Sequence, residues 1–251
     1  MLEMKQVFSG YGKEMILRGV ELQACAGQIT TLLGKNGCGK STVMKTAAGF
    51  LPTRQGKILI DGTDISALTN RQLARLTAYL PQSKNTPDIT AGRFVLHGRF
   101  PYLSYPRRYT SKDHQIAKSV MEELEIAHLW DVPLGELSGG MRQKVYLAMV
   151  LAKESKVILM DEPTTYLDIG QQLRFAELAN DLAARGKTVV LVLHDILLAL
   201  RISHQLYVME QGMVVAGGTP DEILQSGILS GIYQIQIGTT KTDQGIAYFY
   251  K

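Results

Sequence analysis

The sequence contains little cysteine and no long apolar run, and each shortage argues against a class of protein. Cys25 and Cys38 are the only cysteines in 251 residues, which argues against a disulfide scaffold and fits a reducing compartment. The stretch nearest to a membrane span, residues 189–202, is interrupted by charged residues and is shorter than the roughly 18 residues required. Residues 1–10 lack a signal-peptide pattern. We therefore expect a cytoplasmic protein that reaches a membrane only through a partner.

Charge is also scarce. Charged residues make up 20% of the chain and hydrophobic residues 45%, which predicts a folded domain with a full core. The net charge of +4 is too small to indicate nucleic-acid binding, so we expect no nucleic acid partner. The length fits one large α/β domain or two small ones.

Buried strands alternate with helical patterns along the chain. Apolar runs predict strands at residues 28–33, 57–60, 77–80, 156–160 and 188–193. Helical patterns occur at residues 40–48, 112–124 and 141–152 and after the last two strands. This alternation is typical of a largely parallel sheet covered on both faces, while the loss of strand signals between 83 and 155 predicts a helical insert.

A glycine-rich segment, residues 34–41 (Gly-Lys-Asn-Gly-Cys-Gly-Lys-Ser), matches the P-loop pattern between a predicted strand and helix. Its glycines let backbone N–H groups point at phosphate oxygens, and the helix adds the positive end of its dipole. Lys40 is expected to reach the β- and γ-phosphates, and the Ser41 hydroxyl to bind Mg²⁺. The nucleotide-binding residues expected here are Gly34, Asn36, Gly37, Cys38, Gly39, Lys40, Ser41 and Thr42. The cofactors are then ATP and Mg²⁺.

An apolar strand ends in two carboxylates, Asp161 and Glu162. In an α/β sheet such a strand end lies where ligands bind. Asp161 is placed to hold Mg²⁺, directly or through water. Glu162 is the candidate general base for the water that attacks the γ-phosphate.

A second anion site is predicted where Ser138, Gly139 and Gly140 precede a helix. One nucleotide does not need two cradles of this kind, and at this point the sequence resembles the ABC ATPase family. Such an ATPase has a P-loop NTPase (RecA-like) parallel-sheet core with an antiparallel β portion and an inserted helical subdomain. The resemblance divides the single domain 1–251 into an ATP-binding core (1–86 and 155–225), a helical signature subdomain (87–154) and a C-terminal extension (226–251). Asp243-Gln244-Gly245 predicts a hairpin in that extension, formed by the apolar residues 232–237 and 246–250.

Four further residues take roles only through this resemblance. Tyr11 resembles the aromatic residue that stacks on adenine, and His194 the switch histidine that contacts the γ-phosphate. Gln82 resembles the glutamine at the hinge to the helical insert, and it is counted with the catalytic and metal-binding residues. Asp168 belongs to Thr165-Tyr166-Leu167-Asp168, which resembles the loop that touches the opposite subunit.

The resemblance also implies the partners. Two copies close head to tail over two ATP molecules, so that each site uses one copy's P-loop and the other copy's Ser138 segment. Membrane permease subunits bind the pair at the cytoplasmic face of the inner membrane, and an extracytoplasmic binding protein delivers substrate to the permease. One departure is Met141, where the family usually has Gln; because Ser138 and two glycines remain, we expect activity to survive.

The kind of transporter is indicated by Gly98-Arg99-Phe100-Pro101 and by residues 161–169, which resemble ATPases of siderophore, haem and cobalamin importers. We expect the ATPase of a bacterial metal-chelate importer. The alternatives are an ATPase of another importer or exporter, or a non-transport ABC ATPase that acts on ribosomes or DNA.

Overall fold

The computed structural model describes residues 1–82, 86–165, 167–242 and 245–251. The strands are β1 (Leu2–Ser9), β2 (Leu17–Ala24), β3 (Ile29–Leu33), β4 (Gln55–Ile60), β5 (Thr63–Asp64), β6 (Thr77–Leu80), β7 (Val157–Asp161), β8 (Thr188–Val192), β9 (Gln205–Glu210), β10 (Met213–Gly218), β11 (Ile237–Thr242) and β12 (Gly245–Tyr250). The helices are α1 (Lys40–Ala47), α2 (Asn70–Leu76), α3 (Ala91–Leu96), α4 (Ser111–Glu123), α5 (Gly139–Ala152), α6 (Ile169–Ala184), α7 (Ile196–Ile202), α8 (Pro220–Gln225) and α9 (Ile228–Tyr233).

The central sheet has six strands in the order β10-β9-β3-β8-β7-β6. Five of these strands are parallel to one another, in the order β9-β3-β8-β7-β6. The edge strand β10 pairs antiparallel with β9. A second sheet, β2-β1-β4-β5, is antiparallel throughout. The predicted parallel core with an antiparallel portion is therefore confirmed.

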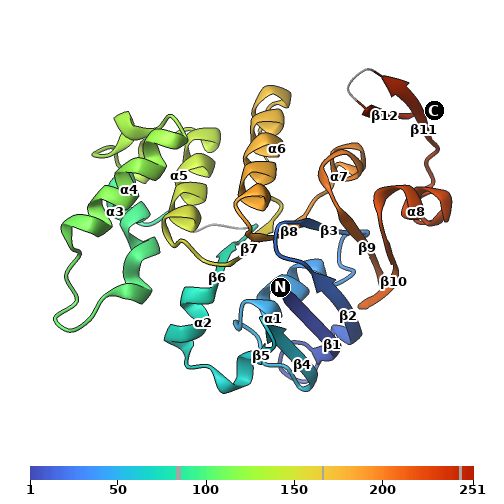
Figure 1. The fold of residues 1–251 in the computed structure, drawn as a ribbon, viewed down its shortest axis with the longest axis horizontal. Helices are drawn as coiled ribbons and strands as arrows, with labels where there is room; N and C mark the ends of the chain where they lie inside the picture. Colours follow the sequence, from blue (N-terminus) through green and yellow to red (C-terminus); the bar gives the residue numbers. More distant parts are fainter. Residues whose placement is uncertain (83–85, 166, 243–244) are drawn as a thin grey trace.

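Both faces of the central sheet are buried. Along β7, Val157 and Leu159 belong to a core shared with α1 and the four-stranded sheet, while Ile158 and Met160 face the core beneath α5, α6 and α7. Figure 1 shows α6 and α7 on one side of the sheet and α1 with β1, β2 and β4 on the other. Neighbouring residues on a strand point to opposite faces, so a sheet covered on both sides needs continuous apolar strands. This explains why β7 and β8 could be found from their sequence alone.

Several helices begin at a side chain that accepts a hydrogen bond from the backbone. Thr110 and Asp113 form a reciprocal capping box at the start of α4, and Thr219 and Glu222 form one at α8. Ser138 caps α5, whose first residue is therefore Gly139 rather than the predicted Met141. The capping residues determine where these helices start, which the apolar periodicity alone does not predict.

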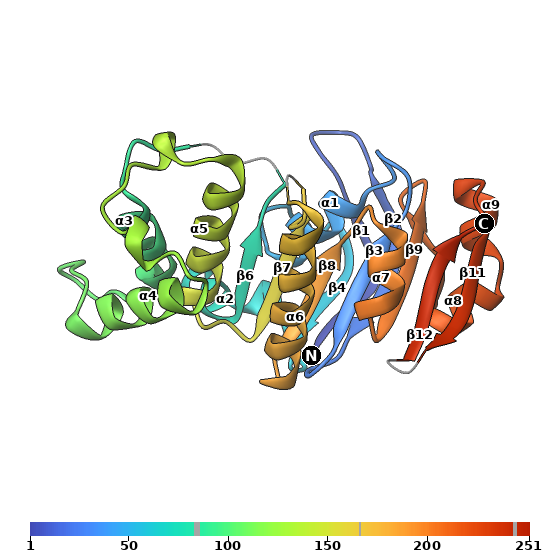
Figure 2. The same cartoon turned by 90° about the horizontal axis from the view of Figure 1, so that it is seen from above.

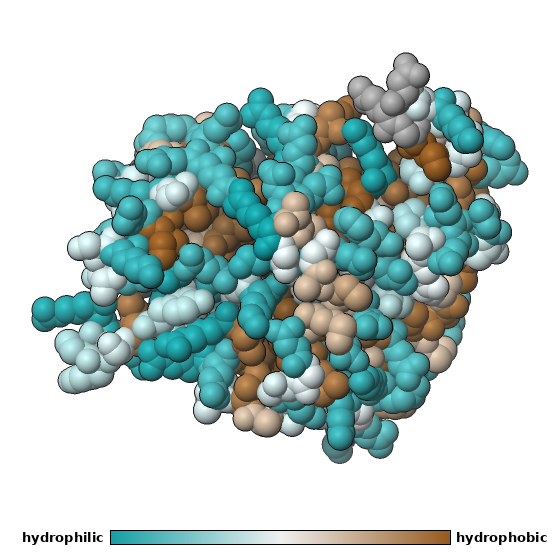
Figure 3. Space-filling model, in the orientation of Figure 1, coloured by the Kyte–Doolittle hydropathy of each residue, from teal (hydrophilic) through white to brown (hydrophobic). Residues whose placement is uncertain are grey.

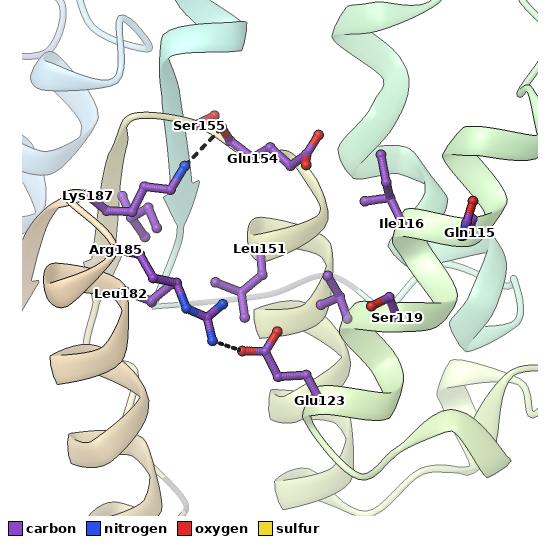
Figure 4. Close-up of a pocket in the computed structure, with 12 residues that line it drawn as sticks. Gln115, Ile116, Ser119, Glu123, Leu151, Glu154, Ser155, Leu182, Arg185 and Lys187 are labelled. Atoms are coloured by element: carbon purple, nitrogen blue, oxygen red, sulfur yellow. Dashed lines mark hydrogen bonds and ion pairs between the residues drawn. The ribbon is translucent and has the colours of Figure 1, made fainter.

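The helices α3, α4 and α5 form the predicted helical region at one end of the molecule (Figure 2). Two ion pairs connect this region to α6 and its C-terminal cap. Arg185 Nη2 lies 2.7 Å from Glu123 Oε1, across the cavity drawn in Figure 4, and Arg174 Nη1 lies 3.3 Å from Glu125 Oε2. Because these side chains are largely exposed, each pair contributes at most about 1 kcal/mol.

The C-terminal extension differs from the prediction in its first half. The predicted hairpin exists as β11 and β12, but Ile232 and Tyr233 end helix α9 and the strand starts only at Ile237. Ile232 is buried in the core cluster that also contains residues of α6 and α7, and the spacing of the apolar residues 228, 229 and 232 also suits a helix. Of the predicted turn, Asp243 and Gln244 lie outside the described residues.

The surface in Figure 3 is mainly hydrophilic, with apolar side chains showing between hydrophilic ones. Within the described parts of the chain, no helix has the length and apolarity to cross a membrane.

Candidate functional site

The predicted site residues follow strands that are neighbours in the central sheet. The P-loop follows β3, His194 follows β8, Asp161 ends β7 with Glu162 next to it, and Gln82 follows β6. These four strands are parallel and adjacent in the order β3-β8-β7-β6. Residues that are up to 160 positions apart in the sequence are thereby brought to the same edge of the sheet, where α/β proteins bind ligands.

The P-loop backbone requires glycine at two positions. A Cβ atom at Gly34 would lie 2.4 Å from the Met209 carbonyl oxygen, and Gly39 has φ +110° at the start of α1. The first N–H groups of a helix have no partner within the helix, and Gly39 has no side chain to cap them. Residues 35–37 are exposed. The loop therefore presents exposed backbone at the N-terminus of α1, where we expect an anion to bind.

Lys40 lies beneath this loop. Its side chain is buried, and Nζ donates to the carbonyl oxygens of Gly34 at 2.7 Å and Lys35 at 3.0 Å. A buried ammonium needs such acceptors. The lysine charge is thus held at the P-loop itself, where phosphate oxygens are expected.

One of the two carboxylate oxygens of Asp161 has no hydrogen-bond partner among the described residues. Tyr79 donates to Oδ2 at 3.3 Å, whereas Oδ1 is buried with no hydrogen-bond partner among the described residues. Burial raises the pKa of Asp161, and the neighbouring Ser41 hydroxyl partly offsets this rise. A buried carboxylate oxygen and a hydroxyl are the oxygen ligands that Mg²⁺ prefers. The residues present therefore fit a magnesium ion between Ser41 and Asp161.

The Glu162 and His194 side chains are in direct contact, with Oε1 and Nε2 2.6 Å apart. Glu162 has φ +53°, an uncommon conformation for a residue other than glycine, and its N–H donates to Val192 of β8 at 3.1 Å. Strained backbone of this kind is frequent at functional sites. The arrangement keeps the Glu162 carboxylate beside the imidazole.

The Ser138 segment lies in a different place. Ser138, Gly140 and Asp168 line a cavity of about 340 Å³ at the N-termini of α5 and α6, and no P-loop residue lines it. Ser138 accepts from the Met141 N–H at 3.3 Å, and Asp168 accepts from the Gln171 N–H at 2.8 Å. Met141 is exposed. Within one copy, the structure therefore groups Asp168 with the Ser138 segment rather than with the P-loop.

The remaining predicted residues lie around the P-loop edge. Tyr11 is exposed in the loop after β1, and Lys45 of α1 donates to its hydroxyl at 3.3 Å. Thr42 is buried in α1, and Gln82 is exposed after β6. Tyr166 of the predicted contact loop lies outside the described residues.

Two tyrosines near the site were not predicted. Tyr79 contacts Asp161 from the neighbouring strand, and the Tyr233 hydroxyl accepts from the Gly34 N–H at 2.6 Å. Neither belongs to a motif, and the sequence carries no signal for such contacts because they depend on which elements become neighbours in the fold.

Comparison with known proteins identifies the family. The sequence model of the ABC transporter family matches residues 17–165. The iron(3+)-hydroxamate import ATP-binding protein FhuC of Bacillus subtilis is 37% identical over 236 residues, which are 93% of this chain and 88% of that protein. The ferric enterobactin transport ATP-binding protein FepC of Escherichia coli is 36% identical, over 92% of this chain and 86% of that protein.

Solved structures agree with this similarity. A structure described as an inward-facing conformation of a metal-chelate type ABC transporter has a TM-score of 0.85 at 26% identity, over 100% of this chain and 96% of that chain. An ATP-binding cassette of an ABC transporter in its ADP conformation has a TM-score of 0.80 at 25% identity, over 93% and 98% of the two chains. The fold is that of the P-loop NTPases. The chain therefore belongs to the ABC transporter family, as a nucleotide-binding subunit that hydrolyses ATP to power transport.

Proposed function

We propose that this chain powers a bacterial importer for a metal chelate such as an iron-siderophore, haem or cobalamin. The observation that carries the proposal is its similarity, over more than nine-tenths of its length, to ATP-binding proteins named for hydroxamate and enterobactin import. Similarity to a transporter described as metal-chelate type supports the same class.

The proposed roles at the nucleotide combine the positions of these residues in the structure with the resemblance to ABC ATPases. Lys40 and the P-loop N–H groups bind the β- and γ-phosphates, and Tyr11 stacks on the adenine. Ser41 and Asp161 would hold Mg²⁺, with Gln82 nearby, and the ion would neutralise phosphate charge. Glu162 is the general base for the attacking water, and His194 contacts the γ-phosphate.

The second half of the site is proposed to come from another copy. Ser138, Gly139 and Gly140 start helix α5 and can donate N–H groups to a γ-phosphate. In one copy Ser138 and Gly140 line a cavity without P-loop residues, which supports a shared site in which a nucleotide on the P-loop meets the Ser138 segment of a partner. Asp168 lies beside that segment and would contact the partner as well. Hydrolysis then requires the closed pair, since part of the charge stabilisation comes from across the interface.

The pair would act at the cytoplasmic face of the inner membrane, bound to permease subunits, with an extracytoplasmic binding protein supplying substrate to the permease. Residues 87–154 are proposed as the subdomain that transmits closure to the permease, 1–86 and 155–225 as the ATP-binding core, and 226–251 as a separate extension.

The proposal is tested by affinity purification of the tagged chain from gently solubilised membranes of its host, with identification of the copurifying proteins. A many-spanning permease, together with chelate-dependent stimulation of its ATP hydrolysis, is expected. A permease stimulated by another class of substrate would contradict the chelate assignment. Ribosomes or DNA-bound proteins instead of a permease would contradict transport altogether.

A further inference from the structure

The C-terminal extension makes a direct hydrogen bond to the P-loop. Tyr233, the last residue of α9, accepts from the backbone N–H of Gly34 with 2.6 Å between oxygen and nitrogen. The two residues are 199 positions apart. Gly34 is buried at the end of β3, so its N–H would have no access to water if this acceptor were missing.

The same glycine also holds the P-loop lysine. The Gly34 carbonyl accepts from Lys40 Nζ at 2.7 Å, so Tyr233 and Lys40 bind the two sides of one residue. Neighbouring groups prevent Gly34 from being replaced by a bulkier residue, because a Cβ atom there would lie 2.6 Å from Cys38 Sγ. The orientation of this residue therefore depends on hydrogen bonds rather than on a side chain of its own.

Helix α9 is firmly placed by the core. Leu229 and Ile232 are buried in the core cluster that also contains residues of α6 and α7, and Tyr233 packs against the same cluster. Burial raises the pKa of Tyr233 to about 12, so its hydroxyl stays neutral at physiological pH and retains its acceptor lone pairs.

We propose that Tyr233 is a positioning residue of the nucleotide site, which fixes the Gly34 peptide and, through it, the resting position of Lys40. The C-terminal extension then belongs to the ATP-binding machinery. This inference rests on the phosphate-binding role proposed above for the P-loop.

A second contact of the extension supports the proposal. Strand β12 packs against α7, the helix that follows His194 by one residue. The extension thus contacts both the P-loop and the segment after the proposed switch histidine.

The test compares Tyr233→Phe with a matched variant, Tyr207→Phe. Tyr207 also accepts from a backbone N–H, that of Gln23 at 3.0 Å, but it connects β9 to β2 and not to the P-loop. ATP affinity of the purified full-length chain is measured by titration, the KM for ATP and kcat by steady-state hydrolysis, and the melting temperature without nucleotide.

In Tyr233→Phe, an unpaired Gly34 N–H is expected to weaken ATP binding and raise KM about tenfold, equivalent to about 1.4 kcal/mol. The kcat should stay within about twofold, because bound phosphates impose the loop geometry once the nucleotide is in place. Tyr207→Phe, which removes an exposed hydrogen bond outside the P-loop, should leave ATP affinity unchanged.

A Tyr233→Phe variant with wild-type ATP affinity and KM would overturn the inference. So would a fall in kcat at unchanged KM, which indicates a smaller folded fraction and hence a structural role only. If the wild-type chain itself bound no ATP, the proposed function would fail, and this inference with it.

Discussion

His194 Nε2 lies 2.6 Å from Glu162 Oε1, so the two proposed catalytic side chains meet at the ends of neighbouring strands. The Glu162 side chain is only 9% exposed, whereas that of His194 is 46% exposed. The imidazole therefore approaches the carboxylate from the solvent side and can keep it oriented at the edge where the P-loop lies. The two side chains can therefore be tested together, by comparing each single variant with the double variant.

Replacing Glu162 by Gln is expected to lower ATP turnover by at least about 100-fold, since a positioned general base contributes that much. ATP binding should persist, because Lys40 and the P-loop are unchanged. With bound ATP that is not hydrolysed, the variant should accumulate as a dimer, which light scattering after gel filtration detects. Wild-type turnover in this variant would remove Glu162 as the base.

Replacing His194 by Ala is expected to reduce turnover about 100-fold as well, because the carboxylate loses its partner and the γ-phosphate a donor. His97→Ala provides a control, since His97 is exposed in the helical region. Combining the His194 and Glu162 changes should cost far less than the product of the two single effects. Fully multiplicative losses would show that the two side chains act independently.

Most of the fold and of the candidate site was predicted from sequence motifs and from continuous apolar runs. The strands ending at residues 160 and 193 were found because each contains a continuous apolar run, 157–160 and 189–193, and the P-loop because its glycines are required at fixed spacing. The antiparallel portion was expected from the resemblance, but its strands β1 and β2 were not located, since both alternate with polar residues and are interrupted by bulges. Tyr79 and Tyr233 were missed because long-range contacts leave no local pattern.

Met141 is expected to be tolerated in place of the usual Gln. It is exposed, and its N–H still donates to the capping Ser138 hydroxyl, so the start of α5 is intact. Met141→Gln should change the rate of ATP hydrolysis by less than about threefold. If the wild-type chain were inactive and Met141→Gln restored turnover, the expectation would be wrong.

The buried ammonium of Lys153 is predicted to lower the free energy of unfolding of this chain at neutral pH. Burial beside the cavity lined by Phe50, Leu73 and Met149 lowers the pKa of Lys153 to about 8. When folding lowers the pKa of a lysine, the charged side chain decreases the free energy of unfolding. This decrease is complete below the folded-state pKa and disappears as the pH rises toward the unfolded-state pKa of 10.5.

Lys153→Met should therefore increase the free energy of unfolding by about 1–2 kcal/mol at pH 7, measured by urea denaturation. The difference from wild type should narrow between pH 8 and pH 10. A difference that stays constant over this range would show that packing, not charge, causes the effect.

We propose that ATP binds between the P-loop of one copy and the Ser138 segment of another. Asn36, exposed in the P-loop, and Ser138 are changed to Cys in two separate chains that also carry Cys25→Ser, Cys38→Ser and Glu162→Gln. The two chains are mixed and oxidised with and without ATP, so that any disulfide between them must cross the interface. A cross-linked dimer is expected to form only with ATP and only in the mixture. A mixture that stays monomeric with ATP, or cross-links equally without it, would rule out the shared site.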